Sequence, residues 1–140
     1  MSETNRSIQG RHAVVTGAAR GIGAAIARSL AAQGAQLTLL GRRADALQQL
    51  ADTLPGAGGH AVVVADVADA ASVAAAFAQA RQALGPIAIL VNNAGQAESA
   101  PFQKTSLELW HRMLGVNLTG SFLCAQAALP DMLKAGWGRI

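Results

Sequence analysis

Four short apolar runs, separated by stretches with helical periodicity, constrain the fold of this chain more than any other feature. Each run is rich in β-branched residues or leucine and is shorter than an ordinary helix. Their hydrophobicity is continuous rather than alternating, which is typical of strands covered on both faces of a parallel sheet. We therefore predict strands at residues 12–16, 36–40, 60–64 and 87–91.

The segments between these runs predict helices, because each carries an apolar stripe at helical spacing. Asp69 suits the N-cap of the third helix, and Thr105 with Glu108 has capping-box spacing at the start of the fourth. We expect the fourth helix to run towards Lys134 with a bend at Pro130. The predicted buried stripes are Ile22, Ile26 and Leu30; Leu47, Leu50 and Leu54; and Val73, Phe77, Ala80 and Leu84.

This alternation of strands and helices predicts a doubly wound α/β domain at residues 11–140, preceded by a polar tail at residues 1–10. The tail lacks the apolar core of a signal peptide, and no apolar run approaches the roughly 20 residues that span a bilayer. We expect a cytoplasmic protein without a membrane partner. A hydrophobic content of 51% argues against disorder.

Charge and metal-ligand residues give little indication of function. The net charge is +3 and the basic residues are spread along the chain, so we expect no nucleic-acid partner. The histidines are scattered, and Cys124 is the single cysteine, so we expect no metal site. Cys124 lies in an apolar stretch and is interpreted as a buried small hydrophobe.

A glycine-rich segment follows the first predicted strand. Gly17, Gly21 and Gly23 have G-x-x-x-G-x-G spacing directly before a predicted helix. Glycines permit a tight turn and close approach to a pyrophosphate, while a helix N-terminus offers free N–H groups and positive potential. The alternative is a strand-to-helix turn without a ligand. A P-loop is excluded, because no Gly-Lys-Ser/Thr follows.

Polar residues also follow the third and fourth predicted strands. Ligands of open α/β sheets bind beyond the carboxyl ends of the strands, so Gly17, Asp66 and Asn92 are expected to meet at one crevice. A solvated turn residue is the alternative for Asp66. For Asn92 and Asn93 the alternative is a role in tying adjacent loops together.

Four motifs in this order resemble the short-chain dehydrogenase/reductase family. They are T-G-x-x-x-G-I-G at residues 16–23, the Asp66-Val67 pair, Asn-Asn-Ala-Gly at residues 92–95, and Asn117 within Val-Asn-Leu. The resemblance, strongest to bacterial 3-oxoacyl or 3-hydroxyacyl reductases, implies a Rossmann-like fold and NAD(P)-dependent hydride transfer between nicotinamide and a ketone or secondary alcohol. The cofactor-binding residues that it implies are Thr16, Gly17, Ala19, Arg20, Gly21, Ile22, Gly23, Arg42, Asp66, Val67, Asn92, Asn93, Ala94 and Gly95.

The residues after the second strand indicate which nicotinamide cofactor is preferred. An NAD site usually has Asp or Glu about 20 residues beyond the glycine loop, but this chain has Gly41-Arg42-Arg43 there. A guanidinium can bind a 2′-phosphate, so NADP(H) is favoured and NAD(H) remains possible. Arg42 is the first candidate and Arg20 the second. The alternative is that Arg42 and Arg43 only begin a solvated helix.

The family's catalytic residues are Asn, Ser, Tyr and Lys, the last two in a Y-x-x-x-K motif with general acid–base roles. Only Asn117 is matched, because the chain has no tyrosine and neither Lys104 nor Lys134 is in the family's position. We therefore expect a C-terminally incomplete Rossmann-like domain, truncated before the Ser/Tyr/Lys segment and inactive alone. Gly115 and Gly120 flank Asn117, so a locally irregular helix is expected.

Other interpretations of the whole chain remain open at this point. One is a non-catalytic dinucleotide-binding or interaction module, and another is a nonfunctional truncation that aggregates through an unpaired sheet edge. The partners implied by the resemblance are a small-molecule carbonyl or alcohol substrate in the complete protein and a second copy packed through the fourth helix. That helix is apolar over Leu114, Leu118, Phe122 and Ala125, and Trp110 and Trp137 are interpreted as packing anchors.

Overall fold

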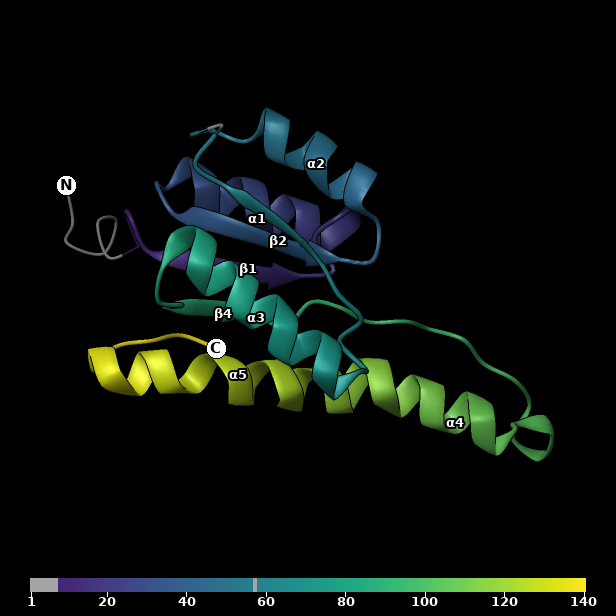
Figure 1. The fold of residues 1–140 in the computed structure, drawn as a ribbon. Helices are drawn as coiled ribbons and strands as arrows, with labels where there is room; N and C mark the ends of the chain where they lie inside the picture. Colours follow the sequence, from purple (N-terminus) through teal and green to yellow (C-terminus); the bar gives the residue numbers. More distant parts are fainter. Residues whose placement is uncertain (1–7, 57) are drawn as a thin grey trace.

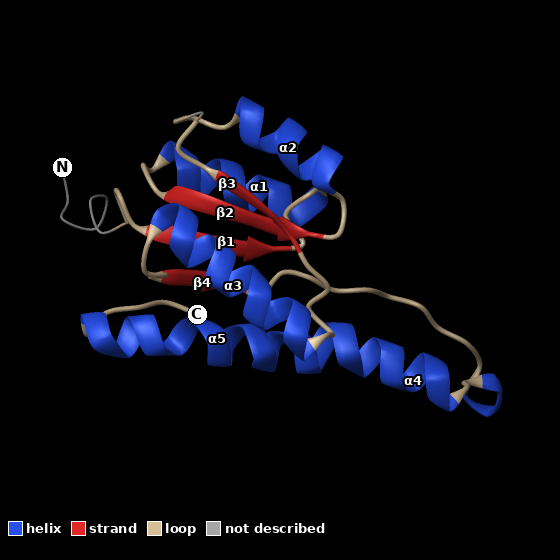
Figure 2. Cartoon of the chain, viewed as in Figure 1, coloured by secondary structure: helices blue, strands red, loops and turns tan. Residues whose placement is uncertain are grey.

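The computed structural model describes residues 8–56 and 58–140, so most of the predicted N-terminal tail lies outside the described residues. It shows a four-stranded parallel sheet of order β3-β2-β1-β4 with helices on both faces (Figures 1 and 2), which confirms the predicted α/β fold. The elements are β1 (His12–Thr16), α1 (Gly21–Ala32), β2 (Gln36–Gly41), α2 (Ala44–Thr53), β3 (Ala61–Val64), α3 (Ala70–Leu84), β4 (Ile89–Val91), the 3-10 turn η2 (Phe102–Lys104), α4 (Leu107–Leu114), the π-helical turn η3 (Gly115–Thr119) and α5 (Gly120–Ala135).

Two of the predicted strands begin later than expected, and side-chain hydrogen bonds replace ladder bonds near both starts. The ring of His60 accepts a hydrogen bond from Leu37 N at 3.0 Å, and the strand begins at Ala61 instead of residue 60. Ile87 N donates to a carboxylate oxygen of Asp131 at 2.9 Å, and β4 begins at Ile89 instead of residue 87.

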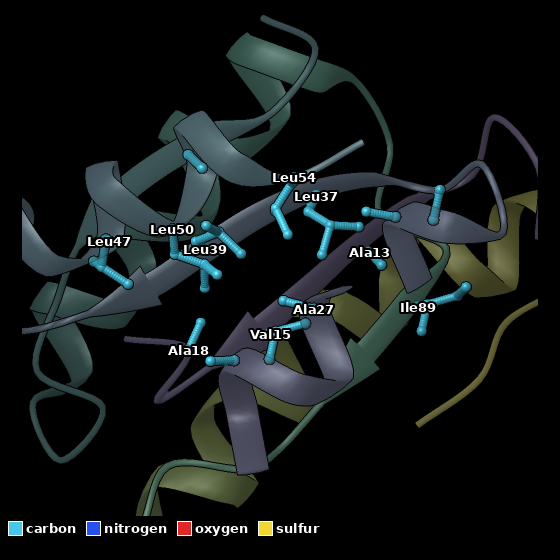
Figure 3. Packing of buried hydrophobic residues seen from close by; sticks show 14 residues of the cluster. Ala13, Val15, Ala18, Ala27, Leu37, Leu39, Leu47, Leu50, Leu54 and Ile89 are labelled. Carbon is cyan, nitrogen blue, oxygen red and sulfur yellow. The ribbon is translucent and has the colours of Figure 1, made fainter. Parts of the chain in front are cut away.

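The core has two halves, one on each face of the sheet. Successive strand residues point to opposite faces, so Ala13 and Val15 pack with α1 and α2, whereas Val14 packs with α3 and α5. Figure 3 shows the first half, in which Leu47 and Leu50 of α2 cover Leu39 of β2. This burial on both faces explains the continuous hydrophobicity of the strands.

The predicted buried face of α1 is wrong at its first position. Ile22 is 74% exposed, while Gly23, Ala27 and Ala31 are buried against the sheet. Small side chains let the helix approach the strands closely, and a Cβ at Gly23 would lie only 2.3 Å from Gly17 O. Sequence periodicity selected the large apolar residues, but close packing of this helix requires the small ones.

The stripe of α2 and the N-cap of α3 are confirmed. Leu47, Leu50 and Leu54 are buried, and Asp69 Oδ1 accepts hydrogen bonds from the main-chain N–H groups that open α3. Phe77 is 1% exposed at the centre of the α3 stripe. Val73 and Ala80 are buried with it, whereas Leu84, the last residue of the predicted stripe, is partly exposed.

The fourth predicted helix differs from the prediction in where it starts and in where it is interrupted. Ser106, not Thr105, is the N-cap, and its hydroxyl accepts from Leu109 N at 3.0 Å. The expected irregularity at Asn117 is confirmed as η3, which separates α4 from α5. The helix is interrupted at η3, and Pro130, where a bend was predicted, lies inside α5, which continues past it.

The segment after α5 returns to the sheet beside β4. Arg139 forms a parallel bridge with Ile89, and its carbonyl accepts a hydrogen bond from Leu90 N at 2.9 Å. Trp137 lies beneath the guanidinium groups of Arg11 and Arg139, at 3.5 and 4.8 Å from the ring centre, so its role as a packing anchor is confirmed. Trp110 is 55% exposed, so that prediction is wrong within this chain.

Cys124 has no accessible surface, which confirms the prediction of a buried small hydrophobe. Burial raises the pKa of its thiol to about 11. The thiolate, which is the reactive form, is therefore scarce at neutral pH.

A buried polar cluster ties the amino-terminal end of the sheet to α3 and α5. His12 Nδ1 donates to Gly85 O at 2.9 Å, and its Nε2 lies 2.7 Å from the Thr38 hydroxyl. Arg81 and Asp131 form an ion pair beside this histidine, 2.8 Å from Nε to the carboxylate. Because a carbonyl can only accept, Nδ1 carries the proton of the neutral ring and Nε2 accepts from Thr38.

We predict that this histidine makes stability depend on pH. Burial lowers the pKa of His12 below 6.5, so between that folded-state pKa and about 6.5 the unfolded chain binds the extra proton. The free energy of unfolding should thus fall as pH drops below about 6.5. Urea unfolding at several pH values should show this slope in the wild type and a weaker one in His12→Gln. An equal slope in both would contradict the assignment.

Candidate functional site

A cleft of about 630 Å³ lies at the carboxyl ends of the strands, a volume typical of small-molecule sites. The loops after β1, β2, β3 and β4 all contribute to it, so the predicted meeting of these strand ends is seen. Its lining residues are Gly17, Ala19, Arg20, Gly21, Ile22, Leu40, Gly41, Arg42, Arg43, Ala46, Ala65, Asp66, Val67, Asn93, Ala94, Gly95, Gln96 and Val116.

The glycine loop after β1 is packed directly against the loop after β4. Gly17 has φ +63°, and a Cβ there would lie 2.8 Å from Ala94 Cα. A Cβ at Gly23 would lie 2.5 Å from Asn93 Nδ2 as well as against Gly17 O. Neither position can hold a side chain without movement of main chain, so both glycines are required by close approach.

The same two loops are joined by hydrogen bonds around Thr16. Its Oγ1 accepts from Asn93 N and from Ala94 N, each at 3.0 Å, and donates to Val91 O at 3.3 Å. Asn93 Nδ2 returns two bonds, to Thr16 O and Gly17 O at 3.2 and 3.1 Å. Asn93 therefore ties the two loops together, and it also lines the cleft.

Asn92 points away from this network towards α5. Its Nδ2 lies 3.4 Å from Ser121 O, and the residue is not among those that line the cleft. The side chain of Asn92 therefore joins the loop after β4 to helix α5, which is neither a contact with the cleft nor a link between adjacent loops.

The first turn of α1 opens into the cleft. Arg20 is its N-cap residue, its side chain makes no capping hydrogen bond, and no acidic residue occupies the first turn. The free N–H groups and the positive end of the helix dipole therefore face the cleft, an arrangement that favours a phosphate or another anion.

Three arginines surround this part of the cleft, and they differ in their partners. Arg43 forms an ion pair with Asp45 at 3.4 Å. The guanidinium groups of Arg42 and Arg20 have no hydrogen bond or ion pair with any residue in the described ranges 8–56 and 58–140. Arg42 is thus a cation available to a ligand, and Gly41 beside it brings no carboxylate.

Asp66 lines the cleft and is also a turn residue. Its Oδ1 accepts from Ala68 N at 3.0 Å, and its main-chain N donates to Ser72 Oγ at 2.9 Å. The geometry therefore contains the turn that was the alternative interpretation, and the carboxylate retains lone pairs towards the cleft.

Asn117 holds the loop after β4 to η3. Its Oδ1 accepts from Gln96 N at 3.0 Å, and its Nδ2 donates to Gln96 O and Met113 O at 2.8 and 3.0 Å. Both of its N–H donors are thereby used. Gln96 lines the cleft, whereas Asn117 does not.

Most of the predicted cofactor-binding residues line the cleft, and three support it from outside the lining. Those three are Thr16, Gly23 and Asn92. Sequence reasoning missed several neighbours of the motifs, of which Val116 and Gln96 carried a signal because each adjoins a motif residue. The missed lining residues are Leu40, Gly41, Arg43, Ala46, Ala65, Gln96 and Val116.

The described part of the chain contains neither a candidate metal site nor a candidate membrane span. No group of three or more His, Cys, Asp or Glu side chains among these residues is placed to hold a metal ion. No helix in residues 8–56 and 58–140 has the length and apolarity needed to cross a membrane.

The fold and cleft together define a dinucleotide-binding type of α/β protein, and sequence comparison gives its family. The chain belongs to the short-chain dehydrogenase family, whose model, described as short chain dehydrogenase, matches residues 11–140. It is 46% identical over 134 residues to D-threitol dehydrogenase from Mycolicibacterium smegmatis, covering 95% of this chain and 52% of that protein. It is 43% identical to oxidoreductase UcpA from Salmonella typhimurium, covering 95% and 51%.

Solved structures agree with this family. A metagenomic short-chain oxidoreductase in complex with NADP superimposes with a TM-score of 0.87 at 36% identity, over 94% of this chain and 61% of that one. A short-chain type dehydrogenase/reductase from Mycobacterium marinum gives 0.89 at 38% identity, over 99% and 57%. The chain spans about half the length of the curated relatives it matches.

Proposed function

We propose that residues 11–140 form the dinucleotide-binding domain of an NAD(P)-dependent oxidoreductase that interconverts a ketone and a secondary alcohol. One observation supports this proposal above all others. The N-terminus of α1, with its free N–H groups, and the guanidinium of Arg42, which has no partner among the described residues, both line the cleft at the carboxyl ends of the strands. The family membership and the dehydrogenase names of the relatives favour this function over a non-catalytic module.

Two groups of cleft residues would hold the two parts of a dinucleotide, its pyrophosphate and its adenosine end. The N–H groups at Gly21 and Ile22 would hold the pyrophosphate, because the glycine loop leaves space for close approach. Asp66 and Val67 would contact the adenine end, and Arg42 would hold a 2′-phosphate, with Arg20 as the second candidate. Bound nicotinamide would supply the hydride acceptor or donor.

The proposed reaction also needs a group that exchanges a proton with the alcohol oxygen. In the family that the motifs resemble, a tyrosine is that group, and the 140 residues contain no tyrosine. Asn117 would act in this scheme by holding Gln96 in the cleft wall.

The substrate is proposed only as a class. Two relatives bear polyol names, D-threitol dehydrogenase and galactitol 2-dehydrogenase (L-tagatose-forming), which supports a secondary alcohol on a small polar molecule. The 3-oxoacyl or 3-hydroxyacyl substrate stays a prediction. The cytoplasmic location also stays a prediction from the sequence.

We expect Arg42→Asp to reverse the cofactor preference. Loss of a charge-assisted contact and repulsion of the 2′-phosphate should weaken NADP⁺ binding by about 100-fold, since such contacts contribute roughly 1.5–3 kcal/mol. NAD⁺ affinity should change little. Titration calorimetry of both nucleotides measures the ratio, and Arg28→Asp is the matched control because Arg28 is exposed on α1 outside the cleft. An unchanged ratio in Arg42→Asp would remove Arg42 from the site.

We also propose that a second copy packs on the outer face of α4 and α5. Exposed large apolar side chains recur along α4, η3 and α5, and exposed apolar surface of this kind is typical of protein interfaces. Sedimentation equilibrium of the chain tests this self-association. The residues of this face are Leu107, Trp110, Leu118, Phe122, Leu129 and Leu133.

A further inference from the structure

The start of α5 passes unusually close to the loop after β3. Gly120 is buried, and a Cβ there would lie 2.8 Å from Val67 Cγ2, 3.1 Å from Val67 Cβ and 3.2 Å from Val67 O. A side chain at this position therefore requires the helix or the loop to move. At Gly115, one turn earlier, a Cβ would meet only Ala68 Cβ, at 3.4 Å.

This close approach bears directly on the cleft. Val67 lines the cleft from the loop after β3, and Val116 lines it from η3. Val116 precedes Gly120 by four residues in the same helical segment, and it packs against the apolar cluster that contains Val67. A shift of this segment relative to Val67 at Gly120 would therefore change the separation between Val67 and Val116.

We propose that Gly120 is a positioning residue for the nucleotide site, which sets the width of an apolar slot between Val67 and Val116 that receives a flat adenine base. The inference rests on the proposed function, because it assigns the adenine end of the same cleft. Its physical basis is the short range of dispersion: a gap of about 0.5–1 Å forfeits a quarter to a half of each contact.

The test uses Gly120→Ala in the 140-residue chain, titrated with NADP⁺ and with 2′,5′-ADP, which contains only the adenine half. We expect both nucleotides to bind about tenfold more weakly, because the slot that they share is widened. Gly115→Ala is the matched control, because it adds the same methyl group to the same helical segment at an ordinary van der Waals distance from Ala68 Cβ. It should change the affinity for either nucleotide by less than about twofold. Circular dichroism monitors folding of each variant.

A second pair of variants tests whether Gly120 acts through Val67. Val67→Ala removes the methyl groups nearest to the added Cβ, so Gly120→Ala should weaken binding much less in that background. The same background carries the test if Gly120→Ala alone does not fold. Folded Gly120→Ala with wild-type affinities, or equal losses in both backgrounds, would overturn the inference. Absence of binding by the wild type would instead overturn the proposed function.

Discussion

Gly23→Ala is expected to cost on the order of 2 kcal/mol of stability and to weaken nucleotide binding more than tenfold. The added Cβ would lie 2.3 Å from Gly17 O and 2.5 Å from Asn93 Nδ2, and a main-chain neighbour cannot rotate away. Overpacking of this kind costs about 1–3 kcal/mol or more, which outweighs the roughly 1 kcal/mol that alanine gains over glycine in a helix. Urea unfolding and nucleotide titration measure the two effects.

Gly21→Ala separates crowding from backbone strain. Gly21 has φ +59°, but no described atom lies within 4 Å of a Cβ built there. That variant should therefore show only the strain of a left-handed alanine, about 1–2 kcal/mol. If Gly23→Ala were as stable as the wild type, the close packing of the glycine loop on Asn93 would be wrong.

Thr16→Val is expected to lose about 2 kcal/mol of stability, although valine has nearly the same shape as threonine. The hydroxyl accepts from Asn93 N and Ala94 N and donates to Val91 O, and Thr16 is 1% exposed. Valine would leave Ala94 N without its partner, whereas Asn93 N keeps Val91 O as an acceptor at 3.0 Å. One unpaired buried N–H costs about 1–3 kcal/mol. Chemical denaturation gives the change in unfolding free energy.

Thr16→Ser keeps the hydroxyl and removes one methyl group, so it is the matched control. It should lose only about 1 kcal/mol, the cost of a buried methyl group and its small cavity. The account of this network would be contradicted if serine destabilised the chain as much as valine.

Sequence reasoning succeeded where one local signal decides the structure. Continuous apolar runs predicted the four parallel strands, and Asp69 predicted the start of α3, because strand burial and N-capping depend on neighbouring residues. The glycine loop was predicted at the cleft for the same reason. Each of these features is encoded within a few residues.

Sequence reasoning failed where contacts between segments far apart in the sequence decide the structure. Ile22 looked like a core residue, but it is 74% exposed and lines the cleft, while the neighbouring Gly23 packs on the glycine loop where a Cβ has no room. Thr105 looked like an N-cap, but its hydroxyl donates to Pro101 O at 3.2 Å and Ser106 caps α4. Val116 adjoins the motif residue Asn117, but its place in the cleft wall depends on the packing of η3 against the loop after β3.

The most direct test of the central claim is titration calorimetry of the 140-residue chain with NADP⁺ and NAD⁺. The proposed site predicts one nucleotide per chain, with NADP⁺ bound more tightly than NAD⁺. Weakened NADP⁺ binding in Gly23→Ala should then place that nucleotide in the cleft. Absence of binding by either nucleotide at concentrations of about 1 mM, to a chain shown to be folded, would contradict the dinucleotide-binding function.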